Sequence, residues 1–282
     1  MDAIRRFTKP QLRRPRALIA FEGWNDACES ASGAVRHVLR EHETEEPFAL
    51  IDPEEFYDFQ VRRPTVAISG GDTRSLTWPS TRFYAVPLPH QQRNLIVVLG
   101  EEPSFRWRTF ARTLNVILAE NDVEQAVLLG AFVGQVAHTR PVPVIGVTTD
   151  RELIERHGLS TSRYEGPTGI VGVLQEACRE EGMPTMSLWA AAPHYLAANA
   201  NPKAMLALLE RSLELLEVGV DTTGLRIAAE EFEQRVDSAM EDSDELTEYV
   251  ADLEETDDVE AIDPESTEDL VNEIESFLRN QE

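Results

Sequence analysis

Short apolar runs alternate with stretches of helical periodicity throughout residues 16–218. The clearest run is NLIVVLG (94–100), and a strand so rich in apolar residues must be buried on both faces of a sheet. Comparable runs occupy 16–21, 48–52, 125–132, 142–149 and 185–193. Between them, apolar residues recur at helical spacing after Asp26 as far as Glu41, and over 107–120, 168–181 and 202–218. This alternation predicts an α/β fold, a three-layer α/β/α sandwich with helices on both faces of a largely parallel sheet.

One stretch departs from that alternation. The runs TVAIS (65–69), SLTW (75–78) and RFYAVPL (82–88) are short, rich in β-forming residues and separated by Gly-Gly-Asp or Pro-Ser. Such spacing is typical of antiparallel strands joined by turns. We therefore expect a mixed, mostly parallel sheet.

The acidic residues are concentrated at the carboxyl end. Residues 230–282 contain 22 acidic and 2 basic side chains, a net charge of −20 out of −25 for the whole chain. Apolar residues still recur three or four apart over 225–240, 244–253 and 267–278, which predicts helices with one narrow apolar stripe, and 254–265 reads as a linker. The sequence thus predicts a basic N-terminal arm (1–15), an α/β/α core domain (16–222) and an acidic helical appendage (223–282).

The charge distribution bears on the partners of the protein. The acidity of the chain argues against nucleic acid as a partner, because binding to phosphates requires a basic stripe and the basic cluster is confined to 5–16. We expect that cluster to be a flexible arm that pairs with acidic surface, the acidic tail being one candidate, with RNA as the alternative. No apolar run reaches the roughly 18 residues that span a bilayer, so no membrane is expected. Cys28 and Cys178 fit reduced structural thiols in a cytoplasmic protein, and a reactive pair is the alternative.

Side chains that could take part in catalysis follow several of the predicted strands. This is the position where open α/β sheets bind ligands. They are the catalytic candidates Glu22, Asp26, Glu101, His138 and His194. Convergence of these residues on one pocket would favour a hydrolase. Alternatively, Glu22 and Asp26 belong to a tight turn and a helix cap, and the two histidines are buried, hydrogen-bonded loop anchors. The chain has no HExxH, GxSxG or metal-ligand spacing, so we predict neither a metal nor a cofactor.

Two glycine-containing segments are candidate anion-binding sites. In YEGPTGIVG (164–172), Gly166, Thr168 and Gly169 precede a predicted helix whose first N–H groups could bind an anion, with Thr168 as the cap. Close packing of the glycines against the sheet is the alternative. The Ser-Gly-Gly-Asp loop (69–72) could cradle a phosphate, but it lacks the lysine of a P-loop and no helix follows it, so a hairpin turn is the favoured interpretation.

Several longer motifs occur together in one order: FEGWNDA (21–27), TWP (77–79), EPSFRW (102–107), HTRPVPVIG (138–146), YEGPTGIVGVL (164–174) and LWAAAPHY (188–195). In these motifs and their order, the chain resembles the proteasome assembly chaperone 2 family. More narrowly, it resembles the actinobacterial branch of that family, whose members often end in an acidic helical extension. The resemblance implies a phosphorylase/hydrolase-like α/β/α fold and a homo-oligomer, specifically a trimer. Family membership implies no established enzymatic activity. The eukaryotic relatives guide assembly of the proteasome α-subunit ring.

The resemblance has one departure. Eukaryotic members dock through a C-terminal hydrophobic–Tyr–any-residue motif, whereas this sequence ends Arg-Asn-Gln-Glu (279–282), so docking by that route is not expected. Our leading hypothesis is a non-enzymatic oligomeric binding protein that contacts proteasome subunits. The alternative is a small-molecule hydrolase or nucleoside-phosphorylase-like enzyme. The four tryptophans are expected in the core or at a subunit interface: Trp24, Trp78, Trp107 and Trp189.

Overall fold

The computed structural model describes residues 3–69, 73–197, 199–241 and 244–255. The helix predicted at 267–278, most of the linker at 254–265 and the glycines of the 69–72 loop lie outside these residues.

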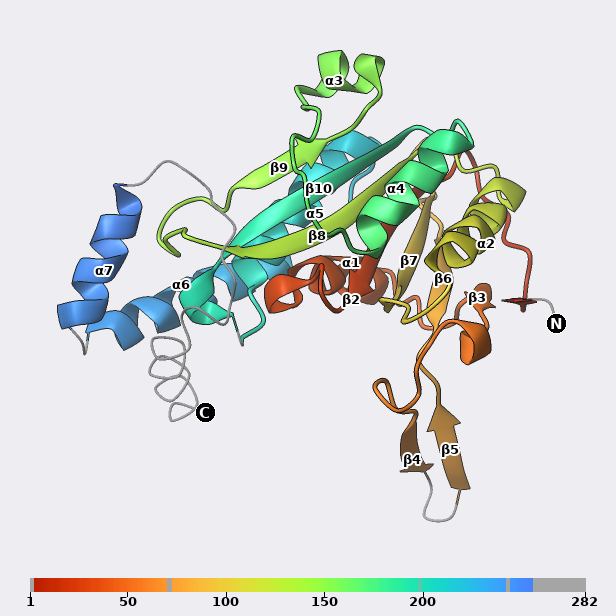
Figure 1. Ribbon diagram of the computed structural model, residues 1–282, viewed down its shortest axis with the longest axis horizontal. Coiled ribbons are helices and arrows are strands. Elements are labelled where there is room, and N and C mark those ends of the chain that lie inside the picture. Colours follow the sequence, from red (N-terminus) through yellow and green to blue (C-terminus); the bar gives the residue numbers. More distant parts are fainter. Residues whose placement is uncertain (1–2, 70–72, 198, 242–243, 256–282) are drawn as a thin grey trace.

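An eight-stranded mixed sheet runs through the molecule in the order β1-β3-β6-β7-β2-β8-β10-β9 (Figure 1). Its strands are β1 (Ile4–Arg6), β2 (Arg16–Glu22), β3 (Ala49–Ile51), β6 (Thr81–Val86), β7 (Leu95–Glu101), β8 (Ala126–Gly134), β9 (Val144–Val147) and β10 (Thr185–Pro193). The central four strands, β7, β2, β8 and β10, are parallel, and the outer strands on both sides add in antiparallel orientation. The predicted mixed α/β sheet is confirmed.

Seven helices accompany the sheet in the part of the chain that the structure describes. They are α1 (Ser30–Glu41), α2 (Trp107–Glu120), α3 (Arg151–His157), α4 (Ile170–Glu180), α5 (Pro202–Leu216), α6 (Thr223–Glu241) and α7 (Asp244–Glu254), with 3₁₀ turns η1 (Ala27–Glu29), η2 (Pro53–Glu55) and η3 (His194–Leu196). Not one of the helices within 3–69, 73–197, 199–241 and 244–255 is both long and apolar enough to cross a membrane.

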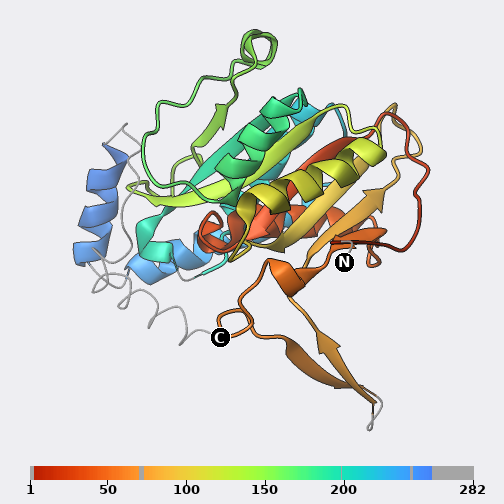
Figure 2. The same ribbon diagram turned by 45° about the vertical axis from the view of Figure 1, so that its right-hand side comes forward.

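The two faces of the sheet are buried under different helices because successive strand residues point to opposite sides. Leu18 and Val97 pack in one core with α1 and α5, whereas Ile19 and Val98 pack in a second core with α2 and α4. Figure 2 shows helices on both sides of the sheet. Burial on both faces explains why the central strands read as continuous apolar runs.

The N-terminal residues differ from the flexible arm that the sequence predicts. Ile4–Arg6 forms β1, which pairs with β3 and extends the sheet. The basic side chains do form ion pairs with acidic residues, but these acidic residues belong to the predicted core domain and not to the acidic tail. The pairs are Arg5 with Asp52, Arg6 with Glu120, Arg14 with Glu124, and Arg16 with Glu217. Backbone pairing, which charge patterning does not reveal, holds this segment in place.

Strand β9 also differs from its prediction. The run at 142–149 was expected to be a buried strand, but β9 lies at the edge of the sheet and is half-exposed, with Ile145 open to solvent. Helix α3 follows it and was not predicted; Asp150 caps it by accepting hydrogen bonds from the N–H groups of Glu152 and Leu153.

The predicted apolar stripes of 225–240 and 244–253 are buried. Phe232 and Val236 of α6 and Val250 of α7 pack with Tyr195 and Leu196 of the core in a third cluster. These two helices therefore cover the end of β10, and their acidic residues form the outer surface.

Strands β4 (Thr65–Ser69) and β5 (Thr73–Thr77) form a separate antiparallel hairpin, as expected for this stretch. The hairpin projects away from the body of the molecule (Figures 1 and 2). Its stem is held by Phe59 and Trp78, whose rings meet edge to face at 4.8 Å.

Candidate functional site

Three segments meet where the parallel strands end: 22–26 from the last residue of β2, 101–105 from the last residue of β7, and 164–169 before α4. We call this surface the carboxyl rim. Glu22 and Glu101 are register partners on adjacent parallel strands, so the first two segments lie side by side. This is the position where the sequence places its acidic catalytic candidates.

Both of these glutamates are paired with arginine. Glu22 forms an ion pair with Arg36 of α1, and Oε2 of Glu101 lies 3.1 Å from Nε of Arg62 in the hairpin stem. Burial raises the pKa of Glu101, and the nearby charge of Glu22 adds to that effect while Arg62 opposes it. The pairing balances the charge of each carboxylate inside the fold.

Asp26 is a helix cap. Its Oδ1 accepts hydrogen bonds from the backbone N–H groups of Ala31 at 2.7 Å and Ser32 at 3.0 Å, in the first turn of α1. Between the carboxylate and the helix, Cys28 and Glu29 both adopt left-handed backbone conformations, with φ of 56° and 50°. Burial raises the pKa of Asp26 to about 6, although the hydrogen bonds oppose the shift. The geometry favours the turn-and-cap interpretation.

The predicted anion site at the start of α4 already faces a carboxylate of this chain. Oε1 of Glu102 accepts hydrogen bonds from the N–H of Ile170 at 2.8 Å and from Nδ2 of Asn25 at 3.0 Å. Gly169 rather than Thr168 is the N-cap residue, and a Cβ on Gly169 would lie 2.0 Å from Asn25. An external anion would have to displace Glu102, so close packing explains Gly169. The third predicted residue, Gly166, lies against the ring of Tyr164.

The two histidines belong to a second group, under α6 and α7. Nδ1 of His138 lies 2.7 Å from the hydroxyl of Tyr195, and its Nε2 lies 3.0 Å from Oδ1 of Asp237. Nε2 of His194 lies 2.8 Å from the hydroxyl of Tyr249. Burial lowers the pKa of both histidines, whereas the hydrogen bond and the charge of Asp237 act to raise the pKa of His138. They are buried, hydrogen-bonded anchors, as the alternative interpretation has it.

The five catalytic candidates thus divide between two settings. Within 3–69, 73–197, 199–241 and 244–255, no hydrogen bond or ion pair joins Glu22, Asp26 or Glu101 to His138 or His194. The partners that define each setting were missed: Arg36, Arg62, Glu102, Tyr195, Asp237 and Tyr249. Of these, Glu102 and Tyr195 adjoin predicted candidates in the sequence, and that adjacency was the available signal.

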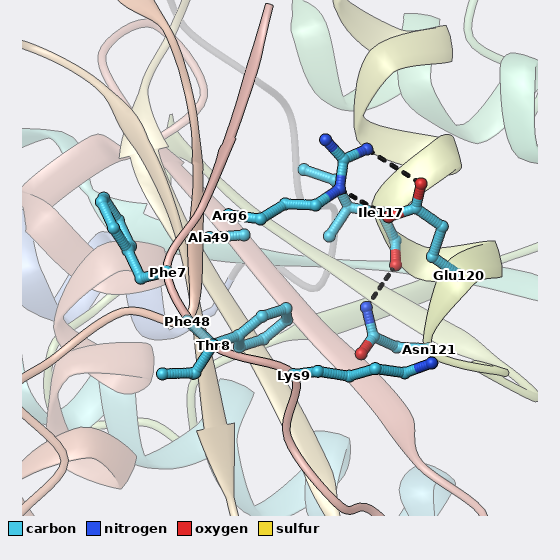
Figure 3. A pocket seen from close by; sticks show the side chains of 9 residues that line it. All are labelled: Arg6, Phe7, Thr8, Lys9, Phe48, Ala49, Ile117, Glu120 and Asn121. Atoms are coloured by element: carbon cyan, nitrogen blue, oxygen red, sulfur yellow. Dashed lines mark hydrogen bonds and ion pairs between the residues drawn. The ribbon is translucent and has the colours of Figure 1, made fainter.

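Two surface pockets of about 370 Å³ each lie away from these groups. The first is lined by Arg6–Lys9 beside β1, by the start of β3 and by the end of α2 (Figure 3). The ion pair between Arg6 and Glu120 closes one side of it. The second is lined by 148–150, by Gln175 and Arg179 of α4 and by 182–185. No predicted site residue lines either pocket.

The remaining reactive groups are possible metal ligands and the two cysteines. Over the described ranges, no group of three or more His, Cys, Asp or Glu residues has the geometry to hold a metal ion. Cys28 and Cys178 are buried and form no disulfide. Burial raises the pKa of Cys28 to about 12 and that of Cys178 to about 11, which keeps both thiols protonated at neutral pH.

Comparison with known proteins identifies the family. The chain is 48% identical to a PAC2 family protein from Streptomyces avermitilis, covering 84% of this chain and 99% of that one with a TM-score of 0.78. It is 41% identical to a proteasome-assembly chaperone homologue from Mycobacterium tuberculosis, covering 83% of this chain and 99% of that one with a TM-score of 0.76.

A more distant structure, an archaeal proteasome activator from Pyrococcus furiosus, shares the fold at 19% identity and a TM-score of 0.66, over 83% of this chain and 97% of that one. No curated protein matches the sequence. The model of the PAC2 family matches residues 20–240, and the chain belongs to that family.

Proposed function

We propose that this protein is a non-enzymatic, homo-oligomeric binding protein of the cytoplasm that acts as an assembly chaperone and contacts proteasome subunits. The observation that carries the proposal is the 41% identity to a proteasome-assembly chaperone homologue over 99% of that relative. Identity at this level extends over the whole fold and is not confined to one motif.

The chemistry of the candidate residues supports binding over catalysis. A catalytic acid or base must reach a substrate proton within hydrogen-bond distance. Here the carboxylate of Asp26 caps α1, and Glu102 caps α4. His138 and His194 are directed into the contact between the core and the helices α6 and α7. These groups stabilise the fold, so we expect the protein to act by binding partners through its surface.

Light scattering on size-exclusion-purified protein tests the proposal, with and without unassembled proteasome α subunits. A mixed complex of defined mass is the expected result. A matched variant that ends at residue 255 keeps every described contact of α6 and α7 and shows whether the last 27 residues contribute. A homo-oligomer whose mass does not change when α subunits are added would overturn the assembly role. A monomer would overturn the proposed homo-oligomer.

A further inference from the structure

The β4–β5 hairpin carries an apolar face that is exposed among the residues that the structure describes. In the register of the hairpin, Val66 is opposite Leu76 and Ile68 is opposite Arg74, so these four side chains share one face. The other face carries small or polar residues such as Ala67 and Ser75. Ile68 is 73% exposed, and Val66 and Leu76 are also exposed. We call Val66, Ile68, Arg74 and Leu76 the hairpin face.

A two-stranded hairpin is marginally stable in water without a surface to pack against. The hairpin points away from the body (Figures 1 and 2), and β4 and β5 pair with each other but with none of the other described strands. Each strand is five residues long, or about 17 Å. The hairpin is therefore long enough to reach across to a neighbouring molecule.

The hairpin and the residues that flank it carry a charge opposite to that of the rest of the protein. Residues 60–82 contain four arginines and one aspartate, a net charge of +3. Arg74 lies in the hairpin itself, and the other three arginines flank it. Because the whole chain carries −25, the remainder carries −28. A partner for this hairpin should be acidic and should offer apolar surface.

The carboxyl rim of the same chain has both properties. Its three segments contain five acidic residues and no basic ones. Two of them are paired with arginine and two cap helices, and the exposed Glu165 is the fifth. They also hold three exposed aromatic side chains, namely Trp24 at 63% exposure, Phe105 and Tyr164. Exposed aromatic rings in segments that also carry carboxylates suit both the aliphatic side chains of the hairpin face and the guanidinium of Arg74.

The rim already binds one arginine of this region, since Arg62 of the hairpin stem pairs with Glu101. We propose that the hairpin face of one copy docks on the carboxyl rim of a second copy. This inference rests on the proposed homo-oligomer and names its interface. Two different surfaces meet, so the contact is head-to-tail, and an assembly built from it closes into a ring when the rotation between copies permits.

The test uses full-length protein carrying Ile68→Asp in the hairpin or Trp24→Asp in the rim. Each variant should dissociate in light scattering, with self-association weakened by about 30-fold or more, as expected for a central apolar anchor. Ser75→Asp places the same charge on the opposite face of the hairpin and should leave the mass unchanged. Circular dichroism of all three variants should match the wild type.

Mixing the two dissociated variants tests the head-to-tail geometry. One intact contact remains, between the hairpin of the Trp24→Asp copy and the rim of the Ile68→Asp copy, so the mixture should form a 1:1 dimer. If the wild type is oligomeric, two outcomes overturn the proposed interface: either variant stays oligomeric, or the mixture of the two stays monomeric. Both outcomes leave the proposed homo-oligomer intact. A monomeric wild type overturns both the interface and the homo-oligomer.

Discussion

The ring of His194 and the hydroxyl of Tyr249 lie 2.8 Å apart, and this hydrogen bond ties helix α7 to the end of β10. A second bond of the same kind, from Nε2 of His138 to Asp237, ties α6 to the loop after β8. Two buried histidines thus hold the acidic helices on the core. The ionisation of these histidines affects the stability of that contact.

Stability should fall as the pH is lowered through the ordinary histidine range. Burial lowers the pKa of His138 and His194, so near pH 6 the unfolded chain binds protons that the folded chain does not. Their contribution is complete above the unfolded pKa of 6.5 and is lost below it. We expect these two histidines to lower the Tm by about 3 °C or more from pH 7.5 to 5.5, measured by calorimetry against a variant in which they do not titrate. The raised pKa of Asp26 acts in the opposite direction and is common to both proteins.

The double variant His138→Gln/His194→Gln isolates this effect. Glutamine retains hydrogen-bonding groups but does not titrate, so the dependence of Tm on pH should become shallower. Burial also lowers the pKa of His42 and His157, which leaves a residual slope. An unchanged slope in the double variant would contradict the assignment.

Removal of one buried hydroxyl should be costly. The oxygen of Tyr195 accepts a hydrogen bond from the N–H of His138 at 2.8 Å and also contacts its ring at 2.7 Å. Tyr195→Phe leaves both groups of His138 without that partner and should lower the free energy of unfolding by about 2–4 kcal/mol in urea titrations. Tyr164→Phe is the control, since that exposed hydroxyl should contribute less than about 1 kcal/mol. Equal losses in the two variants would refute the prediction.

The cap at Asp26 should tolerate an amide. Asp26→Asn keeps an oxygen for the N–H groups of Ala31 and Ser32 and removes a desolvated charge. Because the pKa of Asp26 is raised to about 6, the wild type gains stability from this group as the pH falls from 6 to 4. We expect the variant to be more stable at pH 7.5 by roughly 1–3 kcal/mol and to lack that gain.

Asp150→Asn at the half-buried cap of α3 is the matched control for this experiment. Asparagine and aspartate are comparable caps, so its stability should change by no more than about 0.5 kcal/mol. A loss of stability in Asp26→Asn at pH 7.5 would show that the charge itself strengthens the cap of α1.

Backbone strain before α1 should be relieved by glycine. Glu29 is exposed and adopts φ of 50°, where a side chain costs roughly 1–2 kcal/mol. Glu29→Gly should raise the free energy of unfolding by about 0.5–1 kcal/mol after the entropy cost of glycine. Arg40→Gly, at an exposed position in the last turn of α1, should lower it by a similar amount. If both substitutions lower the free energy of unfolding, the prediction that Glu29 is strained is wrong.

Most of the secondary structure was predictable because burial on both faces leaves a direct mark on the sequence. The runs at 94–100 and 125–132 are central strands, and the stripes at 225–240 and 244–253 are buried. The run at 142–149 also reads as a strand, but it lies at the edge of the sheet. Apolar composition indicates a strand but does not say how many neighbours it has.

The sequence by itself determined the α/β alternation, the acidic appendage and the family, because periodicity, charge and motif order are local properties of the chain. Only the tertiary structure decided how the candidate side chains are used. Glu101 meets Arg62 from the hairpin stem, and His194 meets Tyr249 from the appendage. The partners of a charge in a folded protein come from segments distant in sequence, and one-dimensional spacing does not encode their approach.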